Sequence, residues 1–300
     1  MFGTAFAPAK VNLFLHVGPP DGDGYHPIAS LLAFADIGDR VSVAPAEAMS
    51  FRLSGPFGAG LEGEGRNLVL RAAEALIQAG RRPVAPVALI LEKNLPIAAG
   101  LGGGSSDAGA TLRLLRGAWG LDLSDDALQG LAAALGADGA ACLWGAPVMA
   151  EGRGERLSPA PGLPDLPAVL VNPGVPAPTG AVYGAFDDLG RFGVVEAPPL
   201  PEAFESAEEL AAWLSAQRND LEAAAIRVAP PIGDVLEALS GEAETLLARM
   251  SGSGATCFAL CTGDFEAEQL AERLQALRPD WWVRRCRLGG PWRSRDESPS

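Results

Sequence analysis

The chain has 300 residues, of which 48% are hydrophobic and 20% charged, and its formal net charge is −14 at pH 7. This length predicts about two domains with cores of their own, and the composition is typical of a soluble globular protein. Nucleic acids and anionic membranes are bound through clustered Lys and Arg, so the acidic balance argues against both partners.

The cysteines and the absence of a long apolar segment bear on the compartment. The four cysteines form no Cys-x-x-Cys pair, and three of them lie in apolar runs, which is typical of reduced core thiols. The first ten residues lack the features of a signal peptide, and no apolar run reaches the ~18–20 residues that span a bilayer. We therefore expect a cytoplasmic protein.

The first predicted element is a strand at residues 10–17. Apolar and polar residues alternate there, which predicts one buried face and places Lys10 and Asn12 together on the other. Lys10 and Lys93 are the only lysines in the chain, so a lysine near a candidate site is notable. A lysine at a strand start is also commonly a solvated end, and the pattern alone leaves both interpretations open.

The turn-rich segment 19–27 follows and contains Tyr25 and His26, one of two tyrosines and one of two histidines. An aromatic ring beside a hydrogen-bonding side chain can stack on a heterocyclic base and bond to its edge. A tyrosine that packs on the loop surface is the alternative.

Short strands are predicted at 41–43 and 51–53, followed by a glycine-rich loop that reaches residue 66. Asn67 is a favourable N-cap for a helix through residue 79, and Gly80 is expected to end it in the left-handed conformation.

The segment PIAAGLGGGSS at 96–106 stands between a predicted strand at 87–91 and a predicted helix that carries Ala108, Leu112 and Leu115. Glycines allow positive φ and close approach to a ligand, and the free N–H groups at a helix start attract anions. We therefore predict a phosphate-binding loop. It lacks the lysine of the Walker motif and the third glycine of GxGxxG, and a flexible linker is the alternative.

Ser124 is expected to cap the next helix, which ends at Gly136. Asp138 follows it and leads into an apolar stretch at 140–144. A carboxylate in such surroundings needs a partner or a function, because burial of an uncompensated charge is costly. An aspartate in a plain turn is the alternative.

Four prolines in residues 157–167 indicate a domain boundary. We predict an N-terminal domain at 1–158, a C-terminal domain at 159–290 and a mobile tail at 291–300. The elements expected in the second domain are strands at 168–172, 246–249, 256–260 and 282–288, and helices that follow Thr179, Ser206 and Asn219 or span 232–239 and 265–277. A second glycine turn is expected at 251–255.

Three segments resemble the signature motifs of the GHMP kinases, the family that includes galactokinase, homoserine kinase, mevalonate kinase and phosphomevalonate kinase. They are PAKVNL at 8–13, the glycine loop at 96–106 and GSGA at 252–255. The resemblance implies an α+β fold with two domains, an N-terminal domain like domain 2 of ribosomal protein S5 and a ferredoxin-like C-terminal domain. It also implies phosphoryl transfer from ATP with Mg²⁺ in the cleft between them, with the metal ligands unassigned.

Further segments resemble the members of this family that phosphorylate the 2-hydroxyl of a cytidine-diphosphate-linked methylerythritol in the non-mevalonate isoprenoid pathway. They are DGYH at 23–26, LGAD at 135–138, PGVPAPT at 173–179 and NDLE at 219–222. A kinase of the homoserine or mevalonate type would have no use for a cytosine pocket, and a non-catalytic nucleotide-binding regulator would not need both Lys10 and Asp138. These two functions are the alternatives.

The resemblance implies a role for each matched residue. Asp138 would act as the catalytic base and Lys10 as its electrostatic partner. The expected ATP-binding residues are Asn67 for adenine and, for the phosphates, Pro96, Ile97, Ala98, Ala99, Gly100, Leu101, Gly102, Gly103, Gly104, Ser105 and Ser106. The expected substrate-binding residues are Tyr25, His26 and Tyr183 for cytosine, and Asn12 and Thr179 for the sugar alcohol or for seating the catalytic pair. We expect a monomer or weak homodimer that acts on this small molecule.

The chain departs from the family pattern directly after Asp138. The family commonly continues with Val-Pro and a large apolar residue, whereas this chain has Gly139, Ala140 and Ala141. This departure predicts a less constrained backbone beside the catalytic aspartate.

Overall fold

The computed structural model describes residues 3–61 and 67–292 as an α+β fold built on one sheet of 11 strands. The strands are β1 (Gly3–Asn12), β2 (His16–Val17), β3 (Ile28–Pro45), β4 (Ser50–Ser54), β5 (Val87–Glu92), β6 (Val148–Gly152), β7 (Arg156–Pro159), β8 (Leu166–Asn172), β9 (Thr245–Met250), β10 (Cys257–Cys261) and β11 (Trp282–Gly289). The helices are η1 (Gly58–Leu61), α1 (Leu68–Gly80), α2 (Gly103–Ala118), α3 (Asp125–Leu135), α4 (Gly139–Trp144), α5 (Thr179–Leu189), α6 (Ala207–Ser215), α7 (Glu222–Val228), α8 (Pro231–Ser240) and α9 (Asp264–Leu277).

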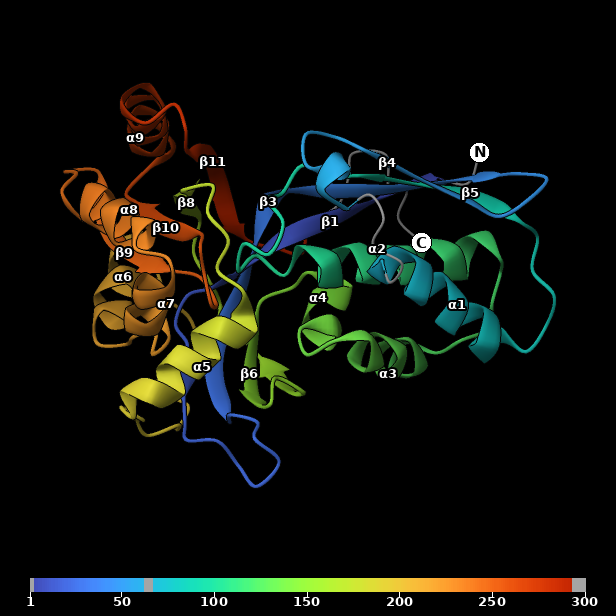
Figure 1. Cartoon of the computed structure of the whole chain (residues 1–300), viewed down its shortest axis with the longest axis horizontal. Helices are drawn as coiled ribbons and strands as arrows, with labels where there is room; N and C mark the ends of the chain where they lie inside the picture. Colours follow the sequence, from blue (N-terminus) through green and yellow to red (C-terminus); the bar gives the residue numbers. More distant parts are fainter. Residues whose placement is uncertain (1–2, 62–66, 293–300) are drawn as a thin grey trace.

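The sheet runs in the order β4-β5-β3-β11-β8-β10-β9, and β1, β2 and β6 also pair with β3. Figure 1 shows α1 to α4 against the part that holds β1, β3 and β5, and α6 to α9 around the part that holds β8 to β11. The long strand β3 and the last strand β11 join these parts, since Leu288 and Gly289 pair with Ala35 and Phe34. The α+β prediction is confirmed, whereas the domain bounds stay a prediction.

The expected strand at 10–17 is wrong in its length and in its exposure. Strand β1 ends at Asn12, and the side chains on both of its faces are buried. Lys10 and Asn12 are each only 4% exposed, because two loops cover their face. The backbone N–H of Lys10 donates to the carbonyl of Leu101, and that of Asn12 donates to Ser251 Oγ.

Helix α1 begins as predicted and ends one residue later than predicted. Asn67 caps it through a bond from the backbone N–H of Val69 to Asn67 Oδ1 (2.9 Å). Gly80 stays helical, and Arg81 takes the left-handed conformation with φ 48°. Close packing explains the glycine, because a Cβ at Gly80 would lie 2.9 Å from Leu121 Cδ2.

Most of the other predicted elements are present with small shifts at their ends, whereas β6, β7 and α4 were not predicted. The strand expected at 41–43 is the end of β3, which has 18 residues and pairs with β1, β5, β6 and β11 in turn. Ser206 caps α6, since its hydroxyl accepts a bond from the N–H of Glu209. All four cysteines are free and buried, as predicted.

Two predictions lie partly outside the described residues. They are the last part of the loop that leads to residue 66 and most of the tail at 291–300. Among the residues that are described, no helix is long and apolar enough to span a bilayer.

Candidate active site

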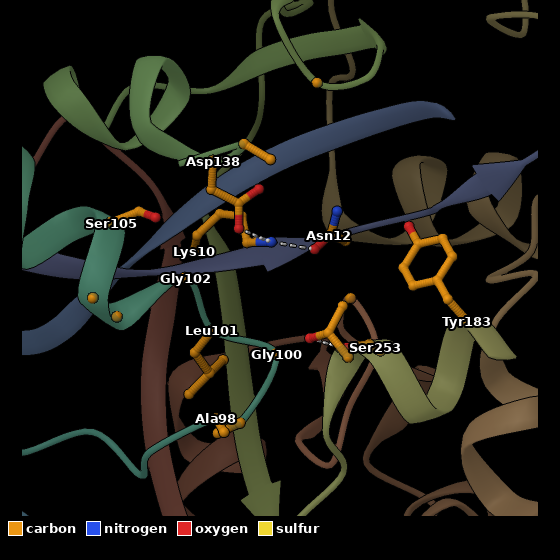
Figure 2. Close-up of a pocket in the computed structure, with 18 of the residues that line it drawn as sticks. Lys10, Asn12, Ala98, Gly100, Leu101, Gly102, Ser105, Asp138, Tyr183 and Ser253 are labelled. Carbon is orange, nitrogen blue, oxygen red and sulfur yellow. Dashed lines mark hydrogen bonds and ion pairs between the residues drawn. The ribbon is translucent and has the colours of Figure 1, made fainter. Parts of the chain in front are cut away.

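A cavity of about 960 Å³ opens between β1, the glycine loop, the start of α2 and helix α5. All residues expected at the site line it except Ser106, which is buried inside α2. Figure 2 shows Lys10, Asp138 and Tyr183 around one space, on segments far apart in the sequence. The local patterns and the family resemblance together therefore selected residues that the fold brings together, and their individual roles stay predictions.

Lys10 and Asp138 form an ion pair at the centre of this cavity. Lys10 Nζ lies 3.2 Å from Asp138 Oδ2 and donates to Asn12 Oδ1 at 2.7 Å (Figure 2). The amide of Asn12 is itself fixed, because its Nδ2 donates to Ser30 Oγ (2.8 Å). The side chain of Lys10 is 6% exposed and that of Asp138 is 41% exposed. The ammonium is therefore buried, whereas the carboxylate is accessible from the cavity.

The glycine loop has the backbone that its composition predicts. Gly100 and Gly102 have φ of 75° and 59°, and Ala98 has φ of 51°, which is unusual for a residue with a Cβ. Gly102 is the N-cap of α2, so the free N–H groups of the helix begin at Gly103. The backbone N–H groups at the start of α2 can hold anionic phosphate oxygens there.

The second glycine turn supports this loop. Ser251 Oγ donates to the carbonyl of Gly100 (3.0 Å), and the N–H of Thr256 donates to the carbonyl of Ala99 (3.1 Å). A Cβ at Gly100 would lie 2.3 Å from the carbonyl oxygen of Ser251, so only glycine permits this approach. Next to it, Thr179 Oγ1 and Ser253 Oγ are 3.0 Å apart. Thr179 therefore lines the cavity in contact with the second glycine turn.

The expectation of a loosely held backbone after Asp138 is wrong. Asp138 precedes α4, and the N–H of Cys142 donates to the carbonyl of Asp138 at 2.9 Å. Gly139 is buried, and a Cβ there would lie 1.9 Å from the carbonyl oxygen of Ala132 in α3. The glycine thus lets α4 pack directly against α3, and this contact fixes the position of Asp138.

A second lysine cluster lies directly beneath the glycine loop. Lys93 Nζ donates to Asp39 Oδ2 and to Asp107 Oδ2, the latter at 2.8 Å, and all three side chains are buried. Asp39 Oδ1 also accepts from the N–H groups of Asn94 and Leu95, which lead into the loop. A Cβ at Gly103 would lie 2.9 Å from Lys93 Nζ. The cluster therefore fixes both ends of the loop.

Asp107 is expected to make the free energy of unfolding depend on pH. Burial raises the pKa of Asp107 to about 7, and the carboxylate of Asp39 adds to the shift while the ammonium of Lys93 opposes it. A carboxyl whose folded pKa lies above its unfolded value contributes stability below the unfolded pKa, and that contribution is lost as the pH rises through 7. We expect the free energy of unfolding to fall from about pH 4 to about pH 7 and to level off above it, and Asp107→Asn to reduce that fall by on the order of 1 kcal/mol or more.

Urea unfolding at pH 5, 6, 7 and 8 measures this effect. Asp122→Asn removes an exposed carboxyl and should leave the pH profile of the wild type unchanged. Parallel profiles for wild type and Asp107→Asn would contradict the prediction.

Aromatic side chains gather at the far end of the cavity. His26 is buried among Tyr183, Phe186 and Phe192, with ring centroids 5.0, 5.8 and 6.3 Å away. Tyr25 is 58% exposed on its loop. Burial raises the pKa of Tyr183 to about 12, with the charge of Asp138 adding to the shift. Its phenol is therefore neutral and able to donate.

Arg153 contacts the loop that carries Tyr25, and no local sequence pattern predicts this contact. Its guanidinium lies 4.3 Å from the centroid of the Tyr25 ring. It also donates to Asp21 Oδ2 (2.7 Å) and Asp23 Oδ2 (2.8 Å). Tyr25 is thus held by a residue from the turn between β6 and β7. The lining also includes Lys93, Asp107 and Asp187, which the sequence analysis did not assign to the site, and Ser253 from the second glycine turn.

Two family comparisons match the two parts of the chain. Residues 67–146 match the GHMP kinases N terminal domain, and residues 200–280 match the GHMP kinases C terminal domain. The first range contains the glycine loop and Asp138.

Individual relatives match almost the whole chain. A 4-diphosphocytidyl-2-C-methyl-D-erythritol kinase of Caulobacter vibrioides (strain NA1000 / CB15N) is 66% identical over 95% of this chain and 99% of its own length. A crystal structure of 4-(cytidine 5'-diphospho)-2C-methyl-D-erythritol kinase superposes with a TM-score of 0.76 at 36% identity, over 96% of this chain and 99% of the other. Homoserine kinase from Cytophaga hutchinsonii shares the fold, with a TM-score of 0.66 at 19% identity over 95% and 94% of the two chains.

Proposed function

The chain belongs to the GHMP kinases, and we propose that it transfers the γ-phosphoryl group of ATP to the 2-hydroxyl of 4-diphosphocytidyl-2-C-methyl-D-erythritol. The premise of this proposal is its similarity to 4-diphosphocytidyl-2-C-methyl-D-erythritol kinases. Membership makes the chain an ATP-dependent small-molecule kinase. The observation that carries the finer proposal is the Lys10–Asp138 pair, which stands in one cavity with the glycine loop and with Tyr25 and His26. The reaction would serve the non-mevalonate isoprenoid pathway.

Asp138 is the group suited to take the proton. As the substrate oxygen forms its bond to the γ-phosphorus, the bond from that phosphorus to the β,γ-bridging oxygen breaks and ADP leaves. The hydroxyl proton passes to the half-exposed carboxylate of Asp138. The ammonium of Lys10 holds that carboxylate and lies where negative charge develops on the attacking oxygen.

The glycine loop is suited to hold the ATP phosphates at the start of α2, with Asn67 and Leu68 lining the same cavity on the side expected for adenine. Mg²⁺ neutralises phosphate charge when it is bound. The described residues contain no cluster of three or more metal-ligating side chains. Phosphate oxygens and water would therefore supply most of its ligands, and Ser105 is an oxygen-bearing side chain of the loop that lines the cavity.

Release of ADP in the presence of ATP and Mg²⁺ tests the proposal. The substrates to compare are 4-diphosphocytidyl-2-C-methyl-D-erythritol, homoserine, mevalonate and galactose, and we expect turnover with the first only. Turnover with homoserine or mevalonate would assign the chain to a different substrate class. ATP binding without turnover of any of them would favour the non-catalytic regulator.

A further inference from the structure

Asn219, the first residue of the NDLE segment, is bonded to the backbone of the second glycine turn and of the strand before it. Its Nδ2 donates to the carbonyl oxygens of Met250 and Gly252, each at 2.8 Å. Its Oδ1 accepts from the N–H of Leu221 at 3.0 Å. The residue is only 7% exposed, and hydrogen bonds at such a site are costly to lose. The amide therefore holds the turn through both hydrogens of Nδ2.

The same segment is bonded to the chain that follows β1. The N–H of Leu15 donates to the carbonyl of Arg218, and the N–H of Asp220 donates to the carbonyl of Leu15, both at 2.9 Å. The N–H of Val17 donates to Asp220 Oδ2 at 2.8 Å. Residues 218–220 therefore join the second glycine turn to the N-terminal segment of the chain.

Ser251 connects the turn to both halves of the site. Its buried Oγ donates to the carbonyl of Gly100 (3.0 Å) and accepts from the N–H of Asn12 (3.1 Å). A Cβ at Gly252 would lie 3.2 Å from the carbonyl oxygen of Gly100 and 3.3 Å from Asn12 Oδ1, so the turn fills the space between them. Asn12 Oδ1 also accepts from Lys10 Nζ (Figure 2). The turn thus sets the distance between the glycine loop and the ammonium of Lys10.

Phosphoryl transfer depends on that distance. The γ-phosphorus and the attacking oxygen must lie in line, and a displacement of about 1 Å can lower the rate by about 10²-fold. Asn219 itself does not line the cavity. It therefore acts on the reaction through its neighbours, of which the turn contacts both the glycine loop and Asn12.

We propose that Asn219 is a positioning residue for phosphoryl transfer, which holds the second glycine turn so that Ser251 keeps the glycine loop and the Lys10–Asp138 pair in register. The inference rests on the proposed function, because that function assigns ATP to the loop and the acceptor hydroxyl to the pair. Asn219 contacts neither ligand, so its loss should disturb the alignment of the reactants more than their binding.

Steady-state kinetics of Asn219→Ala test this role. We expect kcat with 4-diphosphocytidyl-2-C-methyl-D-erythritol to fall by about tenfold or more, while KM for each substrate changes by less than about threefold. Misaligned reactants also let water compete with the acceptor hydroxyl. The variant should therefore release more ADP than it forms phosphorylated product, whereas the wild type should form the two in equal amounts.

Asn172→Ala is the matched control. Asn172 is also buried, and its Oδ1 accepts from the N–H of Gly174 in the way that Asn219 Oδ1 accepts from Leu221. Its Nδ2 donates to Thr256 Oγ1 and not to the backbone of the turn. The two variants should lower the Tm by similar amounts, but Asn172→Ala should leave kcat unchanged. Equal losses of kcat in both variants would assign the effect to lower stability and overturn the inference.

Ser251→Ala interrupts the same route one step later and keeps every side-chain bond of Asn219. It should give a similar loss of kcat and a similar excess of ADP, and it tests the inference even if Asn219→Ala does not fold. In the double variant kcat should be hardly lower than in the slower single variant. Losses that multiply, or a wild-type kcat in either single variant, would overturn the inference. A wild type that phosphorylates no substrate would instead contradict the proposed function itself.

Discussion

Asp138→Asn is expected to lower kcat by roughly 10²-fold or more, which is the scale of the loss of a general base. The variant keeps the size of the side chain but cannot take the hydroxyl proton. The Asp138 side chain is 41% exposed, so the substitution leaves only one buried charge without its ionic partner, the ammonium of Lys10. Single-turnover kinetics measure the chemical step, and ATP affinity from equilibrium binding should change little.

Asp138 and Lys10 form a pair, so the losses of kcat caused by substituting each of them should overlap. Lys10→Met removes the ammonium that orients the carboxylate, and the double variant should be hardly slower than the slower single variant. Asp188→Asn is the control for the loss of one exposed carboxylate, because Asp188 does not line the cavity. A collapse of ATP binding in Asp138→Asn would instead show that the carboxylate holds the nucleotide or its metal, and would contradict a role as base.

Local signals predicted the parts of this fold that depend on a few neighbouring residues. Asn67 and Ser206 cap helices because their side chains reach backbone N–H groups two or three residues ahead. The glycine loop could be predicted for the same reason, since positive φ at Gly100 and Gly102 is a property of the residue itself. The pairing of Lys10 with Asp138 followed from the family resemblance.

The missed features depend on contacts between distant segments. Alternation over 10–17 predicted that only one face of the strand is buried, but loops from residues near 101 and 251 cover the other face. The sequence likewise gives no sign that a methyl group on Gly139 would meet the carbonyl oxygen of Ala132. Arg153 lies more than a hundred residues from Tyr25 and reaches it only because β6 pairs with β3. Such relations arise from strand register and cannot be read from local periodicity.

Lys93→Met is expected to lower the free energy of unfolding by about 3–5 kcal/mol, the usual cost of removing one partner from a buried ion pair. Lys93, Asp39 and Asp107 are nearly inaccessible to water, so the variant leaves two carboxylates facing each other without a cation. Methionine approximates the length of the lysine stem, which limits any cavity. Urea unfolding at pH 8 measures the loss. Arg285→Met is the control, because its ion pair with Asp264 is exposed and should contribute at most about 1 kcal/mol.

The remaining carboxylates distinguish a charge effect from a packing effect. If unpaired charge causes the loss, Asp107→Asn should restore part of the stability of Lys93→Met, because Asp39 then remains alone with the N–H groups of Asn94 and Leu95 as donors. The two substitutions would be strongly non-additive, by about 1–3 kcal/mol in a double-mutant cycle. Additive losses would instead assign the effect to packing around the lysine stem.

Because the cluster fixes both ends of the glycine loop, Lys93→Met should also weaken ATP binding, and Asp107→Asn should recover that affinity together with the stability.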